Sequence, residues 1–265
     1  MEKKKRYLFL SIGYAVLILF LFALIGTFTK KIDNEMLRET LDMIKRTALA
    51  VLIIVYVKKV YKIKIGVHMK GLFKGMFCYG AVLWIMVALS VLFNYLEPEM
   101  SFMEALPFLL FYTAVNMAVG LFEEMLCRGL LFNAFKEYGG DNKKSIYAAV
   151  FLSAFLFGAI HLGNLNGSNT IATIAQVIYA TFFGALFAVI YYRTKNILPC
   201  IILHGIVDLA DCFWECFSYD RAELLDSRGT TDMNIISAVI VVIIASIMLI
   251  SSLVQLKKEF KKRAV

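Results

Sequence analysis

Three ionisable residues interrupt an apolar stretch of the chain and could carry out acid–base chemistry. Glu123, Glu124 and Arg128 lie in the sequence LFEEMLCRGLLF, inside an apolar run from about Leu106 to Phe135. A charged side chain at the centre of a membrane helix costs about 2.5–3.5 kcal/mol, so it generally marks a functional site or a paired contact. Glu124 and Arg128 are four residues apart, with the acid first, which is the favourable order for an ion pair. We expect this pair to have a supporting role.

Glu123 needs a different partner. One residue is a turn of about 100° around a helix, so Glu123 cannot share the face of Glu124 and Arg128. An unpaired carboxylate in a medium of low dielectric constant binds a proton readily, as a general base near neutral pH must. We therefore predict that Glu123 is the catalytic base, with structural burial as the alternative.

Two histidines also lie in apolar runs. Phe157 and His161 are four residues apart in AFLFGAIHLGN, and His204 and Asp208 have the same spacing in CIILHGIVDLADCF. This spacing places each pair on one helical face. A carboxylate bonded to an imidazole fixes its tautomer, as in a general acid/base or a metal ligand. A histidine near the end of an apolar run can equally be an interfacial or core residue.

Membrane helices must position these side chains. Of the 265 residues, 60% are hydrophobic and 18% are charged, and runs of about 20 apolar residues can cross a membrane as helices. We predict an all-α polytopic transmembrane bundle of about eight helices, with an interfacial helix as the alternative for the second. The predicted spans are residues 7–29, 43–61, 71–94, 106–133, 145–163, 170–193, 197–217 and 233–256. No long linker or repeat divides the chain, so we treat 1–265 as one domain with a motif core at about 106–217.

Lys and Arg are concentrated in alternate connecting segments, which is typical of cytoplasmic loops. The pattern predicts a multi-pass plasma-membrane protein with both termini in the cytoplasm. The net charge of +8 then reflects orientation and contact with the lipid bilayer, and no nucleic-acid partner is expected. The many Lys and Ile residues and the short loops suggest a bacterial protein. The sequence does not set the oligomeric state.

The motifs EExxxR, FxxxH and HxxxD occur in this order on three apolar segments. This arrangement resembles the CAAX protease and bacteriocin-processing enzyme family (CPBP, or Abi) of intramembrane proteases. The matching residues are Glu123, Glu124 and Arg128, then Phe157 and His161, then His204 and Asp208. The resemblance implies a peptidase that acts on a peptide or a membrane-associated protein, such as a prenylated CAAX tail, a bacteriocin leader or a signalling peptide.

The resemblance also implies a role for each motif residue. Glu123 and His161 would activate a water for direct attack on a peptide carbonyl, while His204 and Asp208 would stabilise the oxyanion. Many relatives carry Asn at the position of Asp208, and an ionised carboxylate cannot donate a hydrogen bond. Either His204 donates and Asp208 orients it, or Asp208 is protonated, or a metal takes part.

A zinc ion is the alternative to metal-free catalysis, because the family is widely described as metalloproteases. Glu123, His161 and His204 could supply three ligands and leave one position for water. The chain lacks the HExxH helix that usually signals such a site. We slightly favour catalysis without a metal, which leaves glutamate or metal dependence open.

The three predicted catalytic helices must bring their side chains to one depth. At 1.5 Å per residue, Glu123, His204 and His161 lie about 15, 10 and 24 Å from the cytoplasmic ends of their helices. We therefore expect the helix of His161 to be deeply placed or tilted, and a water-filled cavity to open to the cytoplasm. The polar stretch at residues 163–170 is expected to be an outer loop or a re-entrant turn.

Two other functions compete with the protease. A non-catalytic immunity or chaperone-like membrane protein of the same fold would keep the polar cluster for stability. A transporter with a carboxylate proton relay would require related halves, and the sequence shows no such repeat.

Overall fold

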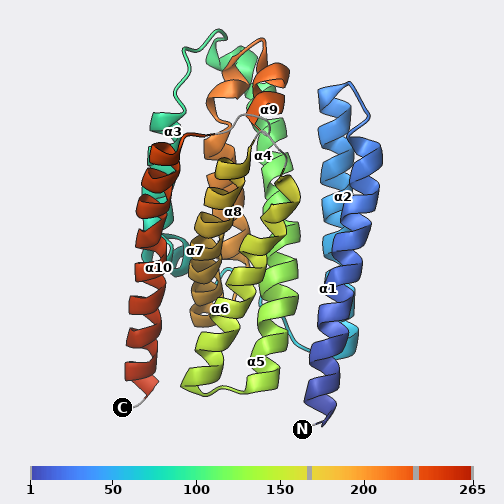
Figure 1. The fold of residues 1–265 in the computed structure, drawn as a ribbon, viewed down its shortest axis with the longest axis vertical. Helices are drawn as coiled ribbons and strands as arrows, with labels where there is room; N and C mark the ends of the chain where they lie inside the picture. The colour runs from blue at the N-terminus through green and yellow to red at the C-terminus, as the bar shows by residue number, and fades with distance from the viewer. Residues whose placement is uncertain (1, 166–168, 229–232, 264–265) are drawn as a thin grey trace.

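The computed structural model describes residues 2–165, 169–228 and 233–263, and all regular structure in these ranges is helical. This confirms the predicted all-α class. Short π-helices or 3-10 helices, labelled η, join several of the α-helices (Figure 1). The elements are α1 (Glu2–Thr29), α2 (Glu35–Tyr56), η1 (Val57–Tyr61), η2 (Lys74–Tyr79), α3 (Ala81–Phe93), α4 (Phe102–Glu124), η3 (Met125–Phe132), α5 (Asn133–Gly139), α6 (Lys143–Ile160), η4 (His161–Asn164), α7 (Thr170–Thr194), α8 (Leu198–Asp211), η5 (Trp214–Phe217), α9 (Arg221–Arg228) and α10 (Ile235–Arg263).

Within the described ranges, five helical segments are long and apolar enough to cross a membrane. They are Glu2–Thr29, Phe102–Gly139, Lys143–Asn164, Thr170–Thr194 and Ile235–Arg263. Helix α3 is a shorter apolar helix, and α8 has only 14 residues. The count of about eight spans therefore stays a prediction. Part of the polar stretch at 163–170, namely residues 166–168, lies outside the described residues.

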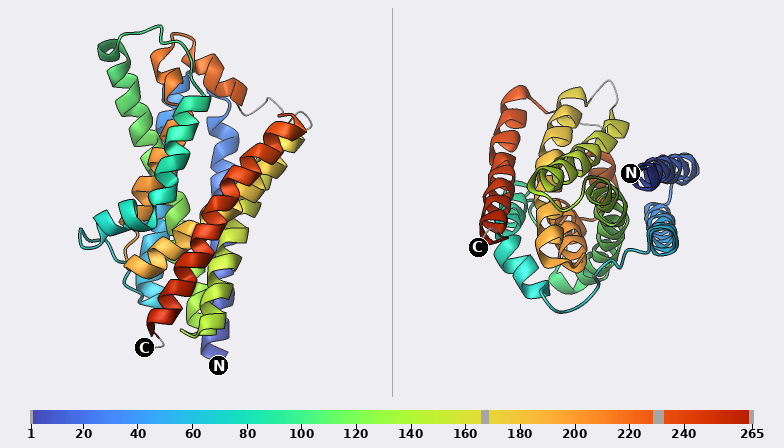
Figure 2. Two further views of the ribbon diagram at one scale, coloured as in Figure 1. Left: turned by 90° about the vertical axis from the view of Figure 1, so that its left-hand side faces the viewer. Right: turned by 90° about the horizontal axis from the view of Figure 1, so that it is seen from below.

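The α1–α2 hairpin stands at one side of the bundle, and α10 covers the opposite side (Figures 1 and 2). Both termini lie at the same end of the molecule, whereas the α1–α2 turn and α9 lie at the other end. Helix α7 is the central element: residues 183–192 are buried without interruption. A helix segment that is buried on all sides belongs to the core, and this one packs between α6, α8 and α10.

Helices α4, η3 and α5 form one continuous helical segment with a change of pitch beside the acidic pair. The backbone N–H of Ser101 donates to Glu104 Oε2 over 2.9 Å and closes the N-terminal turn. After Glu124 the segment becomes π-helical, and such stretches often occur at functional sites. The side-chain amide of Asn133 donates to the carbonyl oxygens of Arg128 and Gly129, at 3.0 Å each, and so satisfies backbone groups in the widened turn.

Glycines allow α4 and α8 to pack with their backbones in close contact. A Cβ atom on Gly120 would lie 2.7 Å from the carbonyl oxygen of Ile201, and one on Gly205 would lie 2.8 Å from the methyl group of Met117. Small residues at helix interfaces have this effect in membrane proteins. The close approach places the end of α4, with its two glutamates, beside α8.

We expect Gly120→Ala to destabilise the protein, because its new methyl group meets backbone that cannot rotate away. Overpacking of this kind costs about 1–3 kcal/mol. The measurement is the midpoint of thermal denaturation of the purified protein in detergent. Gly13→Ala is the matched control, since no atom lies within 4 Å of its added Cβ. Equal denaturation midpoints for the two variants would show that the contact between α4 and α8 can accommodate an additional methyl group.

Candidate active site

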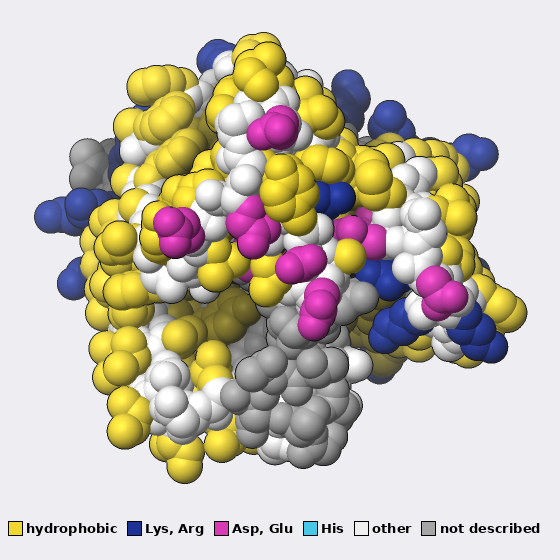
Figure 3. All heavy atoms as spheres, turned by 90° about the horizontal axis from the view of Figure 1, so that it is seen from above, with side chains coloured by type: hydrophobic (Ala, Val, Ile, Leu, Met, Phe, Trp, Pro, Cys, Tyr) yellow, Lys and Arg dark blue, Asp and Glu magenta, His cyan; other side chains and the backbone are white. Residues whose placement is uncertain are grey.

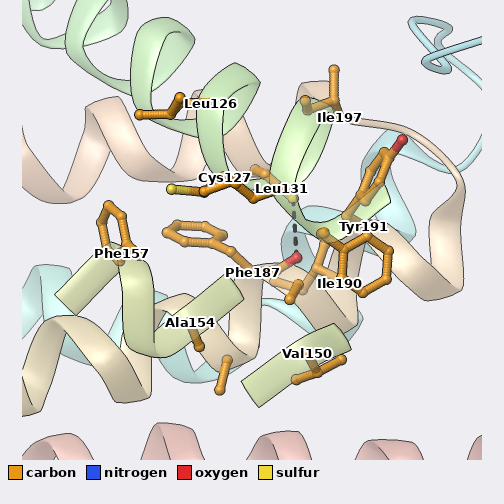
Figure 4. Packing of buried hydrophobic residues seen from close by; sticks show 14 of the residues in the cluster. Leu126, Cys127, Leu131, Val150, Ala154, Phe157, Phe187, Ile190, Tyr191 and Ile197 are labelled. Atoms are coloured by element: carbon orange, nitrogen blue, oxygen red, sulfur yellow. Dashed lines mark hydrogen bonds between the residues drawn. The ribbon is translucent and has the colours of Figure 1, made fainter. Parts of the chain in front are cut away.

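The predicted ion pair between Glu124 and Arg128 is confirmed and fully buried. Arg128 Nη1 lies 2.9 Å from Glu124 Oε1, and neither residue is exposed. Arg128 Nη2 donates to the carbonyl oxygen of Gly184 on α7, also over 2.9 Å. The rings of Phe157 and Phe187 lie 4.9 and 5.3 Å from the guanidinium carbon. Figure 4 shows these two rings facing each other in the apolar core. Arg128 thus joins its own helix to α6 and α7.

Glu124 has a second partner that the sequence did not indicate. His204 Nδ1 lies 2.9 Å from the same Oε1 atom of Glu124. A carboxylate only accepts hydrogen bonds, so Nδ1 of His204 carries a proton and donates it to this contact. The imidazole also stacks on Phe187, with ring centres 5.4 Å apart and planes 12° apart. The orientation of His204 is therefore fixed by one charged partner and one aromatic ring.

The other nitrogen of His204 faces two carboxylates. Its Nε2 atom lies 3.6 Å from Glu123 Oε2 and 3.6 Å from Asp208 Oδ2. The side chain of Glu123 is 27% exposed, whereas that of Glu124 is completely buried. The two neighbouring glutamates therefore occupy different environments, as their positions around the helix predict. Glu123, Asp208 and the Nε2 edge of His204 form one polar group at the junction of α4 and α8.

His161 joins the same region from the end of α6. Its Nδ1 atom lies 2.9 Å from the carbonyl oxygen of Phe157, and because that oxygen only accepts, Nδ1 carries the proton. In the neutral ring Nε2 is then the acceptor. The ring packs edge-on against Phe157 at a centroid distance of 5.1 Å. Helix α6 is inclined to α4 (Figure 2), and the end of α6 reaches the cavity that Val119 and Glu123 near the end of α4 also line.

Glu123, His161, His204 and Asp208 all line one cavity of about 800 Å³. The helices α4, α6, α7 and α8 and the short helix η4 contribute walls, and the α1–α2 hairpin supplies the remaining wall. The structure thus brings together all four residues that the motifs predict to be catalytic. A cavity of this size is within the range of small-molecule and peptide-binding pockets.

The cavity does not extend toward the end where the cytoplasm was predicted. Its hairpin wall consists of residues 19–30 of α1 and residues 42–46 of α2, at the end opposite to both termini (Figure 1). Nearer the termini, apolar side chains such as Ile18 and Ile53 are buried in the core and close the bundle. The predicted orientation and the predicted cytoplasmic opening therefore cannot both hold, because apolar packing fills the end that carries the termini.

The proposed zinc ligands do not converge in this structure. Among the residues that the structure describes, no group of three His, Cys, Asp or Glu side chains could hold a metal ion. The Nδ1 atom of His204 is bonded to Glu124, and that of His161 to a backbone carbonyl. Glu123, His161 and His204 share the cavity without forming a three-ligand site. The reaction proposed for these residues uses no metal.

The comparison with protein families finds a match to part of the chain. Residues 105–210 match a family of CAAX-type membrane proteases, and this segment contains every motif residue from Glu123 to Asp208. The matching family is Type II CAAX prenyl endopeptidase Rce1-like, which confirms the family predicted from the three motifs. The match covers less than half of the chain and excludes the α1–α2 hairpin. No curated protein and no solved structure matches the chain.

Sequence reasoning missed the hairpin wall of the cavity. Asp42, Lys45 and Arg46 face the catalytic candidates across the cavity, although they lie about 80 residues earlier in the chain. Their spacing is a helical i, i+3 and i, i+4 pattern. This spacing predicts a charged cluster on one helical face, but it does not show which other helix that face contacts.

We expect Arg128→Met to be strongly destabilising, because it leaves the buried carboxylate of Glu124 without its ion-pair partner. Removing one partner of a buried pair costs about 3–5 kcal/mol. The double variant Arg128→Met/Glu124→Gln should melt at a higher temperature than the single variant, since no uncompensated charge remains. Arg263→Gln is the control, because its pair with Asp141 is exposed and should contribute little. A double variant no more stable than Arg128→Met would contradict this account.

Proposed function

We propose that this chain is an intramembrane endopeptidase that hydrolyses a peptide or membrane-associated protein with a water activated by Glu123 and His161. The observation that supports it is the shared cavity, which is lined by Glu123, His161, His204 and Asp208. The match to a CAAX-type protease family over the same residues supports peptide-bond hydrolysis as the reaction.

In the proposed reaction, a water held between Glu123 and His161 attacks the carbonyl carbon of the scissile peptide bond. Glu123 accepts one proton from this water as the new C–O bond forms, and the Nε2 atom of His161 accepts a hydrogen bond from the other O–H. The proton on Glu123 then passes to the leaving nitrogen as the C–N bond breaks. The products are a carboxylic acid and an amine. General acid–base catalysis of this kind needs no acyl-enzyme.

His204 is the proposed donor to the oxyanion. With one proton on Nδ1 bonded to Glu124, a second proton on Nε2 can point to the developing negative charge. Asp208 lies 3.6 Å from Nε2 and orients this edge of the ring, so Asp208 itself need not donate. Glu124, Arg128 and Phe157 hold the imidazole before the reaction starts. A fixed donor stabilises an oxyanion without reorganisation.

We expect Glu123→Gln to lower cleavage by about 10²–10⁴-fold, because the amide cannot accept the proton of the water. The assay incubates the protein in lipid vesicles with a peptide library and identifies the products by mass spectrometry. Glu97→Gln is the control, since Glu97 is an exposed loop residue. Chelator should leave the wild-type product yield unchanged. Equal cleavage by wild type and Glu123→Gln would refute Glu123 as the base, whereas an immunity effect that survived the substitution would favour the non-catalytic immunity or chaperone-like role.

We also propose that the protein lies in the plasma membrane with both termini in the cytoplasm. Basic residues gather at the end of the bundle that holds both termini, in the segments 3–6, 136–144 and 257–263, and such residues favour the cytoplasmic side. The cavity then faces the outer half of the membrane. Figure 3 shows this outer end, where Asp and Glu side chains gather over the centre.

This orientation predicts that a cysteine placed at Lys31, next to the cavity end of α1, is labelled by a membrane-impermeant maleimide in intact cells. A cysteine placed at Lys5 should be labelled only after the cells are opened. Both sites are exposed, so accessibility to the reagent depends on the side of the membrane. The experiment requires a background in which the exposed Cys78 is replaced by Ser. The opposite labelling pattern would reverse the orientation and place the cavity on the cytoplasmic side.

A further inference from the structure

The wall of the cavity opposite the catalytic candidates carries a cluster of cations on a buried surface. Lys45 Nζ lies 2.7 Å from Asp42 Oδ1, and Arg46 Nη1 lies 3.3 Å from Asp42 Oδ2. Both cations contact the carboxylate of Asp42, and Glu39 is close enough to interact electrostatically with both. Lys45 is only 6% exposed, and yet it lines the cavity together with Arg46. An anionic group that enters the cavity meets these two cations on the hairpin wall, where ion pairing is favourable.

Stacked aromatic rings connect this cluster to the catalytic end of α4. The ammonium group of Lys45 lies over the ring of Phe22, 4.3 Å from its centre. Phe22 in turn stacks on Phe122 with ring centres 5.1 Å apart, and Phe122 directly precedes Glu123 in the chain. Phe22 lines the cavity, whereas Phe122 is buried in the core behind it. The cation cluster is thus a fixed part of the site.

Arg46 lines the cavity with a side chain that is partly exposed. Its Nη1 atom contacts Asp42, whereas its Nε atom is buried. A guanidinium group presents a planar set of donors that matches a carboxylate. The opposite wall bears the carboxylates of Glu123, Asp208 and Asp211, which repel an anion. An anionic group in the cavity is therefore directed to the α1–α2 side.

We infer that Arg46 and Lys45 form a subsite for a carboxylate group of the peptide substrate. The carboxylate is either the free C-terminus of the peptide or the side chain of an Asp or Glu residue close to the scissile bond. Held there, it orients the peptide so that the oxygen of the scissile carbonyl faces His204 and its carbon faces the water at Glu123. This inference rests on the proposed protease function, but its subsite lies on the hairpin outside the segment that matches the protease family.

Figure 3 supports the direction of binding. Acidic side chains gather over the centre of the cavity end, whereas Lys and Arg side chains gather on the right, over the α1–α2 hairpin. Charges arranged in this way steer an anionic group toward the hairpin and away from the centre. A peptide that carries its carboxylate toward the hairpin would thus enter in one orientation.

The test measures binding without cleavage. The full-length Glu123→Gln protein in nanodiscs is incubated with random octapeptides, each present as a C-terminal acid and as a C-terminal amide. A second library contains amidated octapeptides with and without Asp or Glu. Captured peptides are identified by mass spectrometry. We expect about tenfold enrichment of the acid form or of Asp/Glu peptides, since a hydrogen bond to a charged group contributes about 1.5–3 kcal/mol. The library that shows enrichment identifies the source of the carboxylate.

Three further variants test the assignment to this cluster. Arg46→Gln should abolish the preference, and Arg46→Lys should restore part of it. Asp42→Asn should increase it, because the competing carboxylate is removed while an oxygen remains to accept from Thr29 and Lys45. Lys31→Gln is the control, since it removes one exposed charge from the same hairpin without touching the cavity.

Equal capture of all peptides, capture of none, or a preference that survives Arg46→Gln would overturn the carboxylate subsite. These results are separate from the outcome of the cleavage assay. Cleavage that depends on Glu123, without any carboxylate preference, would leave the protease function standing and the subsite refuted. A carboxylate preference that depends on Arg46, without cleavage, would support the subsite and refute the protease function.

Discussion

One buried guanidinium group organises the core of this bundle. Arg128 has no exposed surface, and a charge in that position must have its partners in place. It contacts Glu124 on its own helix, the carbonyl oxygen of Gly184 on α7, and the rings of Phe157 and Phe187. These partners join the helical segment of Arg128 to α6 and α7. A side chain at Gly184 would fill this space, because its Cβ would lie 3.3 Å from Arg128 Nη2.

The same guanidinium positions the proposed chemistry through Glu124. One oxygen of Glu124 accepts from both Arg128 and His204, so the orientation of the imidazole depends on the ion pair. This arrangement separates the two neighbouring glutamates into distinct roles. Glu124 is completely buried and accepts hydrogen bonds from Arg128 and His204, whereas Glu123 is partly exposed in the cavity. The structural and the reactive carboxylates are therefore adjacent in sequence but differ in their access to water.

The sequence was sufficient for the helical class, the protease family and the Glu124–Arg128 pair, because these depend on composition, on motifs and on local helical spacing. It was not sufficient for contacts between helices. The bond from Glu124 to His204 joins residues 80 positions apart, and no local pattern encodes it. It was also not sufficient for the end of the bundle at which the cavity lies. Counting residues gives a depth along each helix, but the packing of Ile18 and Ile53 decides which end of the bundle is closed.

The residues proposed for catalysis and the cations proposed for substrate selection lie on different parts of the fold. The motif residues belong to α4, η3, α6, η4 and α8, inside the segment that matches the protease family. The cations of the opposite wall belong to the hairpin, which contacts the core mainly through α2 on α4 and α1 on η3 and α5. Changes on the hairpin can therefore alter the charge that faces a substrate without disturbing the Arg128–Glu124–His204 chain. A protease built in this way can keep one hydrolytic mechanism while its hairpin determines which peptides reach it.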